Sequence, residues 1–225
     1  MKFPFVLATA NPDKAREICE VLTDAWDHAL AAWALDVGDA TVGFLVSTPD
    51  GIADAVAEVR PVDTPPDVEE NGATLEDNAR IKALGLSHAY KLDAVADDTG
   101  LEVDMLGGAP GARSARYAGD DANSARNVEK LLTALDGVDA AHRNARFVTV
   151  ALARFVDGRE VAVQGSVEGT ITDAPRGESG FGYDPVFQPR EGDGRTFAEM
   201  RADEKHAMSH RGRAFRALAD ALRGE

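Results

Sequence analysis

Two acidic residues interrupt an apolar stretch near the middle of the chain, where a carboxylate is able to hold a cation or accept a proton. Residues 94–96 have the pattern of a buried strand, which continues directly into Asp97, Asp98 and Thr99. At the carboxyl end of a strand in an α/β sheet, such acids face the crevice where ligands bind, and a buried carboxylate needs a metal or a donor nearby. Because successive side chains of a strand point in opposite directions, we expect one acid to be catalytic and the other structural.

A second polar group surrounds the start of a predicted helix. Thr74 and Asp77 form a capping pattern, and the apolar residues that follow recur at helical spacing, at Leu75, Ala79, Ala83, Leu86 and Tyr90. Asn78 and Lys82, four residues apart, share a neighbouring face of this helix, and Glu70 lies just before it. Acids near a helix N-terminus usually complement the helix dipole, so a binding role competes with that ordinary one.

The N-terminal segment predicts a place for an anion. Residues 3–8 form an apolar run that ends near Thr9, after which Asn11 suits a helix N-cap and Pro12 the first helical position. Lys14 then lies in the first turn, beside the free backbone amides at the positive end of the dipole. No Walker phosphate-binding motif occurs in the chain, and the alternative is an ordinary capped helix with a surface lysine.

The last third of the chain combines glycines, an aromatic residue and cations. Gly180 and Gly182 flank Phe181 and permit close approach of a flat ligand, on which Phe181 is able to stack while Asp184 accepts hydrogen bonds. Lys205, His210 and Arg211 precede a predicted terminal helix, where a cation gains nothing from the dipole. An anion or an electron-rich ring at the same site would explain the cluster, and the alternatives are a glycine-rich bend and a solvated basic turn.

The remaining elements predict an α/β fold with a mixed sheet. Asp157–Gly158 is a hairpin signal between strand patterns at residues 147–155 and 160–163, so part of the sheet is antiparallel. Asp120 or Asp121 is expected to cap a helix, and residues 42–46 have a strand pattern. Helical spacing of apolar residues near the N-terminus favours a further helix through Trp26, Ala29, Leu30 and Trp33.

Composition narrows the class of protein. The chain has 225 residues, 44% hydrophobic and 28% charged, which is typical of a globular protein and suits one domain in two lobes. A net charge of −15 argues against nucleic-acid and anionic-membrane partners. No apolar run approaches the roughly 20 residues of a membrane span. The single cysteine, Cys19, permits no internal disulfide, so we expect a reducing, cytoplasmic location.

Taken together, these motifs closely resemble one family, the inosine triphosphate pyrophosphatases, which hydrolyse non-standard purine nucleoside triphosphates. The resemblance covers nearly the whole chain. It rests on six ordered blocks, namely LATANPDKAREI at 7–18, EENGATLEDNARIKA at 69–83, ADDTGLEVDMLGGAPGARSARYAG at 96–119, SGFGYDPVF at 179–187, GRTFAEM at 194–200 and EKHAMSHRGRA at 204–214. Four positions depart from the usual pattern without removing a charge or the expected base, namely Ala10, Asn71, Thr99 and His206.

The resemblance implies hydrolysis of ITP, dITP and XTP to the monophosphate and pyrophosphate with Mg²⁺, which cleans the nucleotide pool. It also implies a homodimer and an elongated mixed sheet flanked by helices, with two lobes of a single domain, residues 1–225, around a long central cleft. Asp98 would be the base that activates water, and Glu70 and Asp98 would hold the metal. The other implied residues bind substrate, and they are Thr9, Asn11, Lys14, Asn78, Lys82, Thr99, Phe181, Gly182, Tyr183, Asp184, Lys205, His210 and Arg211.

Three other functions fit parts of the sequence. A pyrimidine nucleoside triphosphate pyrophosphatase would share the same motifs. A nucleotide-binding sensor without catalysis would bind ITP and release no pyrophosphate, although the acids at Glu70 and Asp98 count against it. A structural interaction protein with an acidic surface would leave the acids, the anion site and the terminal cations unexplained together.

Overall fold

The computed structural model describes residues 5–8, 14, 17–18, 20–22, 30–37, 40–47 and 68–223. The chain divides into two compact units, which are treated separately below. Unit 1 consists of Met1–Asp98, Val150–Gly165 and Gly212–Glu225. Unit 2 consists of Thr99–Thr149 and Ser166–Arg211.

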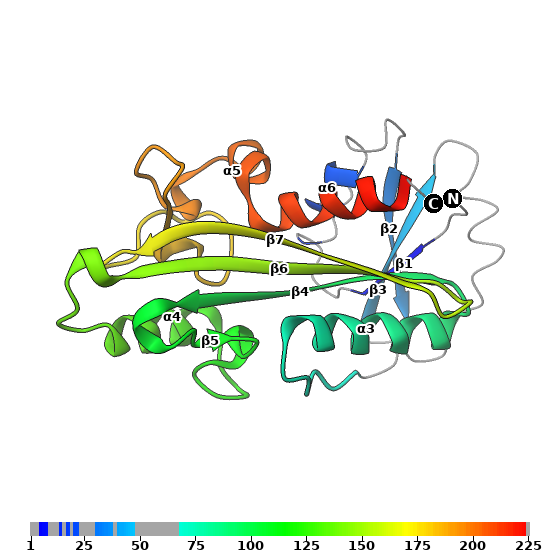
Figure 1. The fold of residues 1–225 in the computed structure, drawn as a ribbon, viewed down its shortest axis with the longest axis horizontal. Helices are drawn as coiled ribbons and strands as arrows, with labels where there is room; N and C mark the ends of the chain where they lie inside the picture. The colour runs from blue at the N-terminus through cyan, green and yellow to red at the C-terminus, as the bar shows by residue number, and fades with distance from the viewer. Residues whose placement is uncertain are drawn as a thin grey trace. The chain divides into compact units, whose positions relative to one another are not determined.

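Eight strands in the described part of the chain form one mixed sheet, as the sequence predicts (Figure 1). The strand order is β2-β3-β1-β4-β6-β7-β8, and β5 pairs with β4. The strands are β1 (Phe5–Ala8), β2 (Leu30–Val37), β3 (Ala40–Ser47), β4 (Asp93–Val103), β5 (Pro110–Gly111), β6 (Asn144–Arg154), β7 (Glu160–Ile171) and β8 (Phe187–Pro189). The α-helices with defined bounds in the described part of the chain are α3 (Leu75–Tyr90), α4 (Ser124–Ala134), α5 (Ala202–Met208) and α6 (His210–Arg223). Short 3-10 helices span Asp104–Leu106, Ser114–Arg116, Ala140–His142, Asp184–Val186 and Phe197–Glu199.

In unit 1, helices cover both faces of the sheet, with α3 on one side of β4, β6 and β7 and α6 on the other (Figure 1). The capping box predicted at Thr74 is present: its hydroxyl accepts from the Asp77 amide, and the Asp77 carboxylate accepts from Thr74. All five residues of the predicted stripe on α3 are buried. One core joins α6 to the strands through Leu7, Ile18, Val95, Ala151, Phe215 and Leu218.

In unit 2, α4 packs against the strands through buried apolar residues. Val128, Leu131 and Leu135 are buried in one cluster with Phe147, Val167, Phe187 and Phe197. Phe147 and Phe187 meet edge to face, with ring centroids 4.6 Å apart. The segment that carries Phe181–Asp184 packs against this aromatic core, because Tyr183 and Val186 belong to the same buried cluster.

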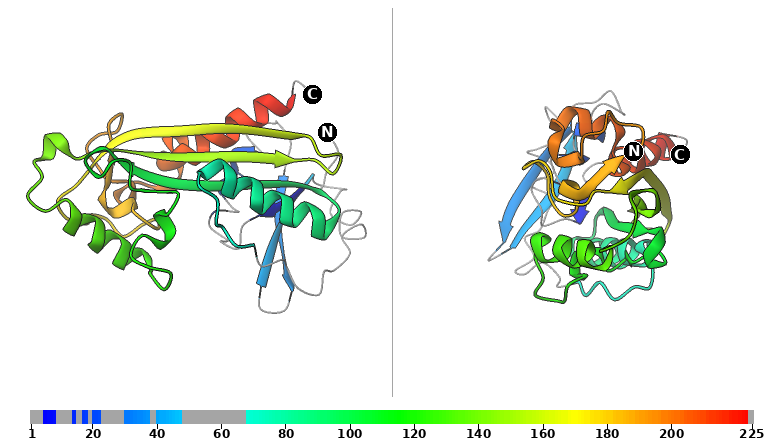
Figure 2. Two further views of the ribbon diagram at one scale, coloured as in Figure 1. Left: turned by 60° about the horizontal axis from the view of Figure 1, so that its bottom comes forward. Right: turned by 90° about the vertical axis from the view of Figure 1, so that its left-hand side faces the viewer.

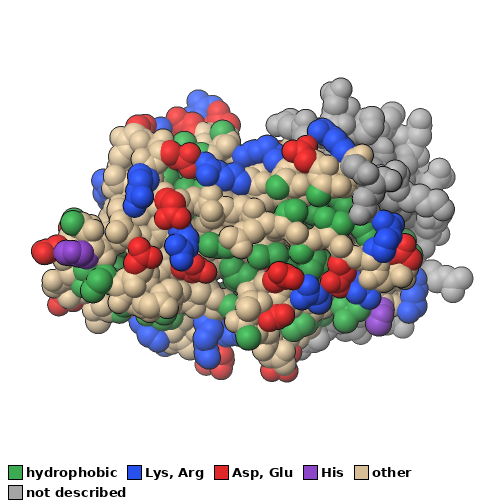
Figure 3. Space-filling view, viewed as in Figure 1, with side chains coloured by type: hydrophobic (Ala, Val, Ile, Leu, Met, Phe, Trp, Pro, Cys, Tyr) green, Lys and Arg blue, Asp and Glu red, His purple; other side chains and the backbone are tan. Residues whose placement is uncertain are grey.

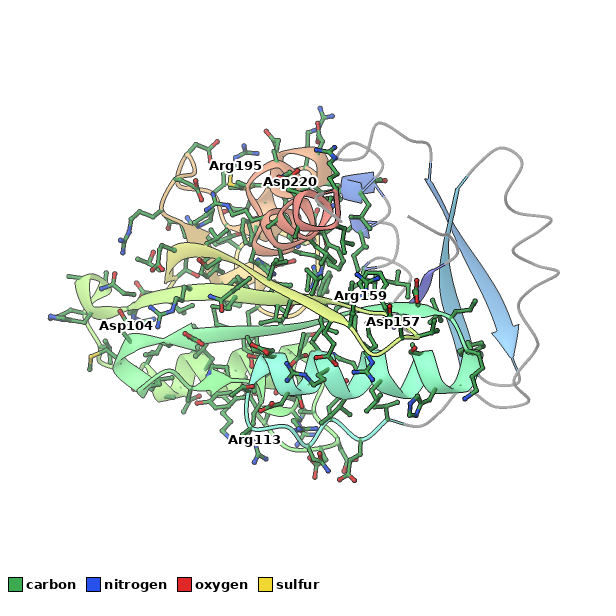
Figure 4. The ribbon with its side chains drawn as sticks, turned by 45° about the vertical axis from the view of Figure 1, so that its right-hand side comes forward. Asp104, Arg113, Asp157, Arg159, Arg195 and Asp220 are labelled. Atoms are coloured by element: carbon green, nitrogen blue, oxygen red, sulfur yellow. The ribbon has the colours of Figure 1, made fainter. Side chains whose placement is uncertain are left out.

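The hairpin predicted at Asp157–Gly158 is confirmed as the turn between β6 and β7. Figure 4 shows Asp157 and Arg159 side by side in this turn, where the Arg159 amide donates to Asp157 Oδ1 at 2.9 Å. The side chain of Arg159 also donates to Asp157 Oδ2, at 2.9 Å. The turn is thus closed by one carboxylate that accepts from both backbone and side chain of the residue two positions later.

The helix favoured by the spacing of Trp26, Ala29, Leu30 and Trp33 is wrong where the structure describes it. Leu30 and Trp33 lie in β2, which pairs antiparallel with β3 along its whole length (Figure 2), while Trp26 and Ala29 lie outside the described residues. A short apolar run fits either period, and pairing with the next strand decides between them. The strand predicted at residues 42–46 is part of β3.

The cap predicted at Asp120 or Asp121 is also wrong. The N-cap of α4 is Asn123, whose side chain accepts from the Arg126 amide at 3.0 Å. The acids precede it in a turn, in which the Ala122 amide donates to the Gly119 carbonyl. Asparagine caps as well as aspartate does, so residue type alone did not decide the boundary.

The surface carries charges of both signs. On the face shown in Figure 3, basic and acidic side chains are interspersed, and neither sign forms one continuous field. Within the described residues, no helix is long and apolar enough to cross a membrane.

Candidate functional site

The two acids of β4 begin where the neighbouring strand ends. The sequence places these acids at the carboxyl end of a strand, but they lie inside β4, which continues through Asp97 and Asp98 to Val103. Its parallel partner β1, however, pairs only as far as Ala8 opposite Ala96. Within the described residues, the acids therefore lie one and two positions beyond the last residue of this parallel pair, and both are buried, with Asp97 2% and Asp98 8% exposed.

Asp98 is held by two side chains of α3. Asn78 Nδ2 donates to Asp98 Oδ2 at 3.1 Å, and Lys82 Nζ donates to Asp98 Oδ1 at 3.1 Å. Lys82 Nζ also donates to Glu70 Oε2, at 3.2 Å. These hydrogen bonds connect four predicted site residues of unit 1. We call Glu70, Asn78, Lys82 and Asp98 the carboxylate cluster.

Burial changes the proton affinity of both charged partners. Burial raises the pKa of Asp98, and the charge of Lys82 with the Asn78 hydrogen bond offsets only part of this effect. Burial alone would lower the pKa of Lys82, but the charges of Asp98, Asp97 and Glu70 outweigh it, so the pKa is raised. Lys82 therefore stays charged, and Asp98 binds a proton more readily than an exposed aspartate does.

Asn78 links Asp98 to the backbone ahead of α3. It is 1% exposed, and its Oδ1 accepts from the Gly72 amide at 2.8 Å. A side chain at position 72 would have its Cβ 2.7 Å from Asn78 Oδ1 and 2.6 Å from Asp77 Cβ, closer than real Cβ contacts. Gly72 is therefore needed for this connection, and the structure places Asn78 as a support for Asp98.

Asp97 faces a different partner. Lys14 Nζ lies 3.9 Å from Asp97 Oδ2, and the Asp97 side chain is 2% exposed. The predicted alternation is confirmed in this respect, because the two neighbouring acids contact different elements. Lys14 is helical, as predicted, while Thr9 and Asn11 lie outside the described residues.

In unit 2, a buried ion pair supports the predicted stacking residue. Lys205 Nζ donates to Asp184 Oδ2 at 2.6 Å, and the same oxygen accepts from the Phe181 amide at 2.9 Å. Lys205 Nζ also lies 4.9 Å from the centroid of the Phe181 ring. A Cβ at Gly180 would collide with the Asp184 carboxylate, so glycine is required beside it. We call Phe181, Asp184, Lys205 and Arg211 the aromatic cluster.

Arg211 is the second cation at this ring. Its guanidinium carbon lies 5.5 Å from the Phe181 centroid, although the residue is only 1% exposed. Arg211 Nη2 donates to Thr99 Oγ1 at 3.3 Å, and the Thr99 and Thr149 hydroxyls are 2.8 Å apart. The predicted residues Thr99 and Arg211 are thus in contact.

Two other predicted residues of unit 2 are packed inward. Tyr183 is 4% exposed, and its hydroxyl donates to the Ser114 carbonyl at 2.9 Å; burial raises the pKa of this phenol. The His210 ring stacks on Phe147 with centroids 4.5 Å apart. Gly182 lines a groove of about 520 Å³ together with α4, Pro175 and Pro185.

The helix assignment of the terminal cations needs one correction. The sequence predicts that Lys205, His210 and Arg211 all precede a terminal helix, but Lys205 lies inside α5. Ser209 ends α5 in an extended conformation, and α6 begins at His210. At the start of this short helix the Arg201 amide donates to Glu204 Oε2 at 2.8 Å, and the sequence pattern does not show the helix as separate from α6.

Sequence reasoning missed two supporting residues. Thr149 is fully buried and holds Thr99, and Gly72 holds Asn78. Thr149 carries a signal, because it is the polar residue in the otherwise apolar run at 147–153. A buried hydroxyl needs a partner, so this interruption of β6 indicated a contact.

Comparisons with known proteins show a likeness along nearly the whole chain. Residues 5–221 match the model of the Ham1 family. The chain is 42% identical over 219 residues to a dITP/XTP pyrophosphatase of Streptomyces avermitilis, which covers 97% of this chain and 96% of that protein. It is 43% identical over 218 residues to a dITP/XTP pyrophosphatase of Thermus thermophilus, covering 97% and 91%.

A solved structure extends the likeness to the fold. A HAM1 protein from Coxiella burnetii is similar with a TM-score of 0.72 and 32% identity, over 97% of this chain and 98% of that chain. The family resemblance inferred from the six sequence blocks is thereby confirmed. The chain belongs to the Ham1 family.

Proposed function

We propose that this protein hydrolyses ITP, dITP and XTP to the nucleoside monophosphate and pyrophosphate, with Mg²⁺ as cofactor, and so removes non-standard purines from the nucleotide pool. The observation that carries the proposal is the carboxylate cluster, in which an aspartate with a raised pKa lies beside a charged lysine. The relatives named dITP/XTP pyrophosphatase cover nearly the whole chain and support the same reaction.

The carboxylate cluster suits a magnesium ion by its chemistry. Glu70 and Asp98 offer carboxylate oxygens, which are the ligands that Mg²⁺ prefers, and Mg²⁺ is commonly held by one or two carboxylates together with substrate phosphates. Within the described residues, no group of three or more His, Cys, Asp or Glu is placed to hold a metal by itself. When bound, the ion would neutralise phosphate charge and polarise the reacting phosphoryl group.

The residues of unit 1 would carry out the hydrolysis. Asp98 accepts a proton from a water molecule, whose oxygen attacks the α-phosphorus. The bond from this phosphorus to the bridging oxygen breaks, and the electron pair leaves with pyrophosphate. Asn78 orients Asp98, while Lys82 and Lys14 offset the negative charge of the phosphate oxygens. Thr9 and Asn11 are proposed to bind the same triphosphate.

The aromatic cluster would select the base. Phe181 offers a ring for stacking. Among the described residues, the Lys205 ammonium donates one hydrogen bond, to Asp184, so two of its three N–H donors are available to a base. A 6-keto oxygen accepts from such donors, whereas the 6-amino group of ATP would face them with donors of its own. Each buried polar group left unpaired costs about 1–3 kcal/mol, which gives tens- to hundreds-fold discrimination.

We also propose that the protein acts as a homodimer in the cytoplasm, as the family resemblance implies. Analytical ultracentrifugation of the purified chain tests the assembly. A single species of about twice the monomer mass supports the dimer, and a monomer at micromolar concentration contradicts it.

A nucleotide panel tests the reaction. The purified protein is supplied with excess Mg²⁺ and, separately, with ITP, dITP, XTP, GTP, ATP, UTP and dTTP, and pyrophosphate is measured apart from orthophosphate. We expect pyrophosphate from ITP, dITP and XTP at rates at least tens-fold above those for ATP. Faster turnover of UTP or dTTP would favour the pyrimidine alternative, while binding of ITP without product would favour a sensor.

A further inference from the structure

Lys82 occupies the position between the two carboxylates that are proposed to hold the metal. Its Nζ lies 3.2 Å from Glu70 Oε2 and 3.1 Å from Asp98 Oδ1, and no more than 14% of the Lys82 side chain is exposed. One ammonium therefore already pairs with both carboxylates in the nucleotide-free protein and offsets part of their charge. A metal ion that binds the same carboxylate oxygens must therefore displace the Lys82 ammonium from them.

The hydrogen bonds of Asp98 identify the contested oxygen. Asn78 holds Oδ2, and Asn78 is itself fixed through the Gly72 amide, whereas Lys82 holds Oδ1. Departure of Lys82 would therefore leave Oδ1 available to a metal ion without disturbing the hydrogen bond at Oδ2. Glu70 lies outside α3 and its side chain is 39% exposed, so it is the member of the pair that can adjust its position.

Lysine suits such an exchange because its charge sits on a flexible four-carbon stem. An ammonium repelled by an incoming divalent ion is able to turn toward oxygens that still lack a cation. A triphosphate supplies those oxygens, since it presents several negative charges and the metal cannot contact them all. A metal ion that arrives alone brings no new acceptor for the lysine.

We propose that Lys82 and the metal ion exchange partners: Lys82 holds Glu70 and Asp98 in the nucleotide-free protein, which weakens binding of a lone divalent ion, and moves to the phosphate oxygens when metal and triphosphate enter together. This inference rests on the proposed function for the identity of the phosphate ligand. Lys82 would thereby ensure that the site is loaded by the metal–triphosphate complex in preference to the free ion.

The test compares two ligands on one variant. Mn²⁺ binding to nucleotide-free protein is measured by the electron paramagnetic resonance signal of free Mn²⁺, in the wild type and in Lys82→Met. The same proteins are then titrated with Mn²⁺–tripolyphosphate by calorimetry. We expect Lys82→Met to bind Mn²⁺ alone about tenfold more tightly than the wild type, and Mn²⁺–tripolyphosphate about tenfold more weakly.

Matched variants locate the effect. Arg80→Met removes a cation from the same helix that pairs with Glu76 and Glu160 instead, so it should change neither affinity. Lys82→Met combined with Asp98→Asn should lose the tighter Mn²⁺ binding. Lys82→Gln repeats the test with a polar side chain, and circular dichroism reports folding of each variant.

The directions of the two affinity changes, for Mn²⁺ alone and for Mn²⁺–tripolyphosphate, decide the outcome. Opposite changes for the two ligands support the exchange, because a merely structural lysine would weaken both. Equal or weaker binding of Mn²⁺ alone by both folded Lys82 variants overturns it. Since no measurement here requires turnover, inactivity of the wild type toward ITP would defeat the proposed function separately.

Discussion

The carboxylate cluster and the aromatic cluster each place a lysine on a buried aspartate, but they use the pair differently. Lys82 divides its donors between Asp98 and Glu70 at 3.1 and 3.2 Å, whereas Lys205 makes one bond of 2.6 Å to Asp184. Asp184 in turn accepts from the Phe181 backbone, and its side chain is 3% exposed against 11% for Asp98. The first pair is therefore able to change partners, and the second is a fixed support.

Under the proposed function, this difference separates hydrolysis from recognition of the base. The carboxylate cluster holds groups that gain or lose a proton or a cation, and none of its residues is aromatic. The aromatic cluster places two cations beside one ring, with Lys205 4.9 Å and Arg211 5.5 Å from the centre of Phe181. Changes in the first should lower turnover of every nucleotide alike, and changes in the second should alter the ratio between nucleotides.

Asp98→Asn should give the largest effect. Asparagine keeps the shape and the acceptor for Lys82 but cannot take a proton, and general-base assistance is typically worth about 10²–10⁴-fold. We expect kcat for ITP and XTP to fall by at least this factor together, with an unchanged circular dichroism spectrum. Near-normal turnover, or loss for only one nucleotide, would remove Asp98 from this role.

Lys205→Met should act on selectivity. Without the ammonium, the donor proposed to face the 6-keto oxygen is gone, so the preference for ITP over ATP should fall from tens- or hundreds-fold toward parity, measured as the ratio of kcat/KM values. The variant also leaves Asp184 buried without its cation, which costs about 3–5 kcal/mol of the unfolding free energy.

A double variant separates these two consequences. Asp184→Asn combined with Lys205→Met removes the unpaired charge, so it should recover much of the stability in urea unfolding without recovering the preference. If the preference for ITP over ATP returned together with the free energy of unfolding, Lys205 would only support the fold. The proposed difference in role between the two clusters would then be wrong.

Tyr183→Phe should have the smallest effect on catalysis. The lost hydroxyl donates to the Ser114 carbonyl inside unit 2, so the expected cost is about 1–3 kcal/mol in the free energy of unfolding. The ratio of kcat/KM values for ITP and ATP should stay within about twofold of the wild type, since the phenol is turned inward. A large change in that ratio would place Tyr183 among the residues that contact the base.

Local signals predicted much of the fold because each had a local physical cause. The capping box at Thr74, the stripe along α3 and the turn at Asp157–Gly158 all depend on residues within a few positions of one another. The strand at Leu30–Val37 depends instead on pairing with β3, and the break at Ser209 depends on two helices meeting. Neither contact changes the spacing of apolar residues in its own segment, so the sequence pattern does not predict it.

The site follows the same division. Residue types identified the acids, the lysines and Phe181, and the structure groups them into two clusters. The roles of the inner contacts were not readable, because hydrogen bonds such as Asn78 to Gly72 and Asp184 to the Phe181 amide depend on side-chain direction. Asn78 and Asp184, both expected to bind substrate, are engaged in holding other groups in place.

The pairing of β1 with β4 as far as Ala8 and Ala96 has a consequence for redesign of the protein. Within the described residues, Asp97 and Asp98 follow the last paired position directly, so a two-residue insertion that extended β1 along this ladder would pair both acids with it. We therefore expect the length of β1 to change the surroundings of the two acids without substituting either of them.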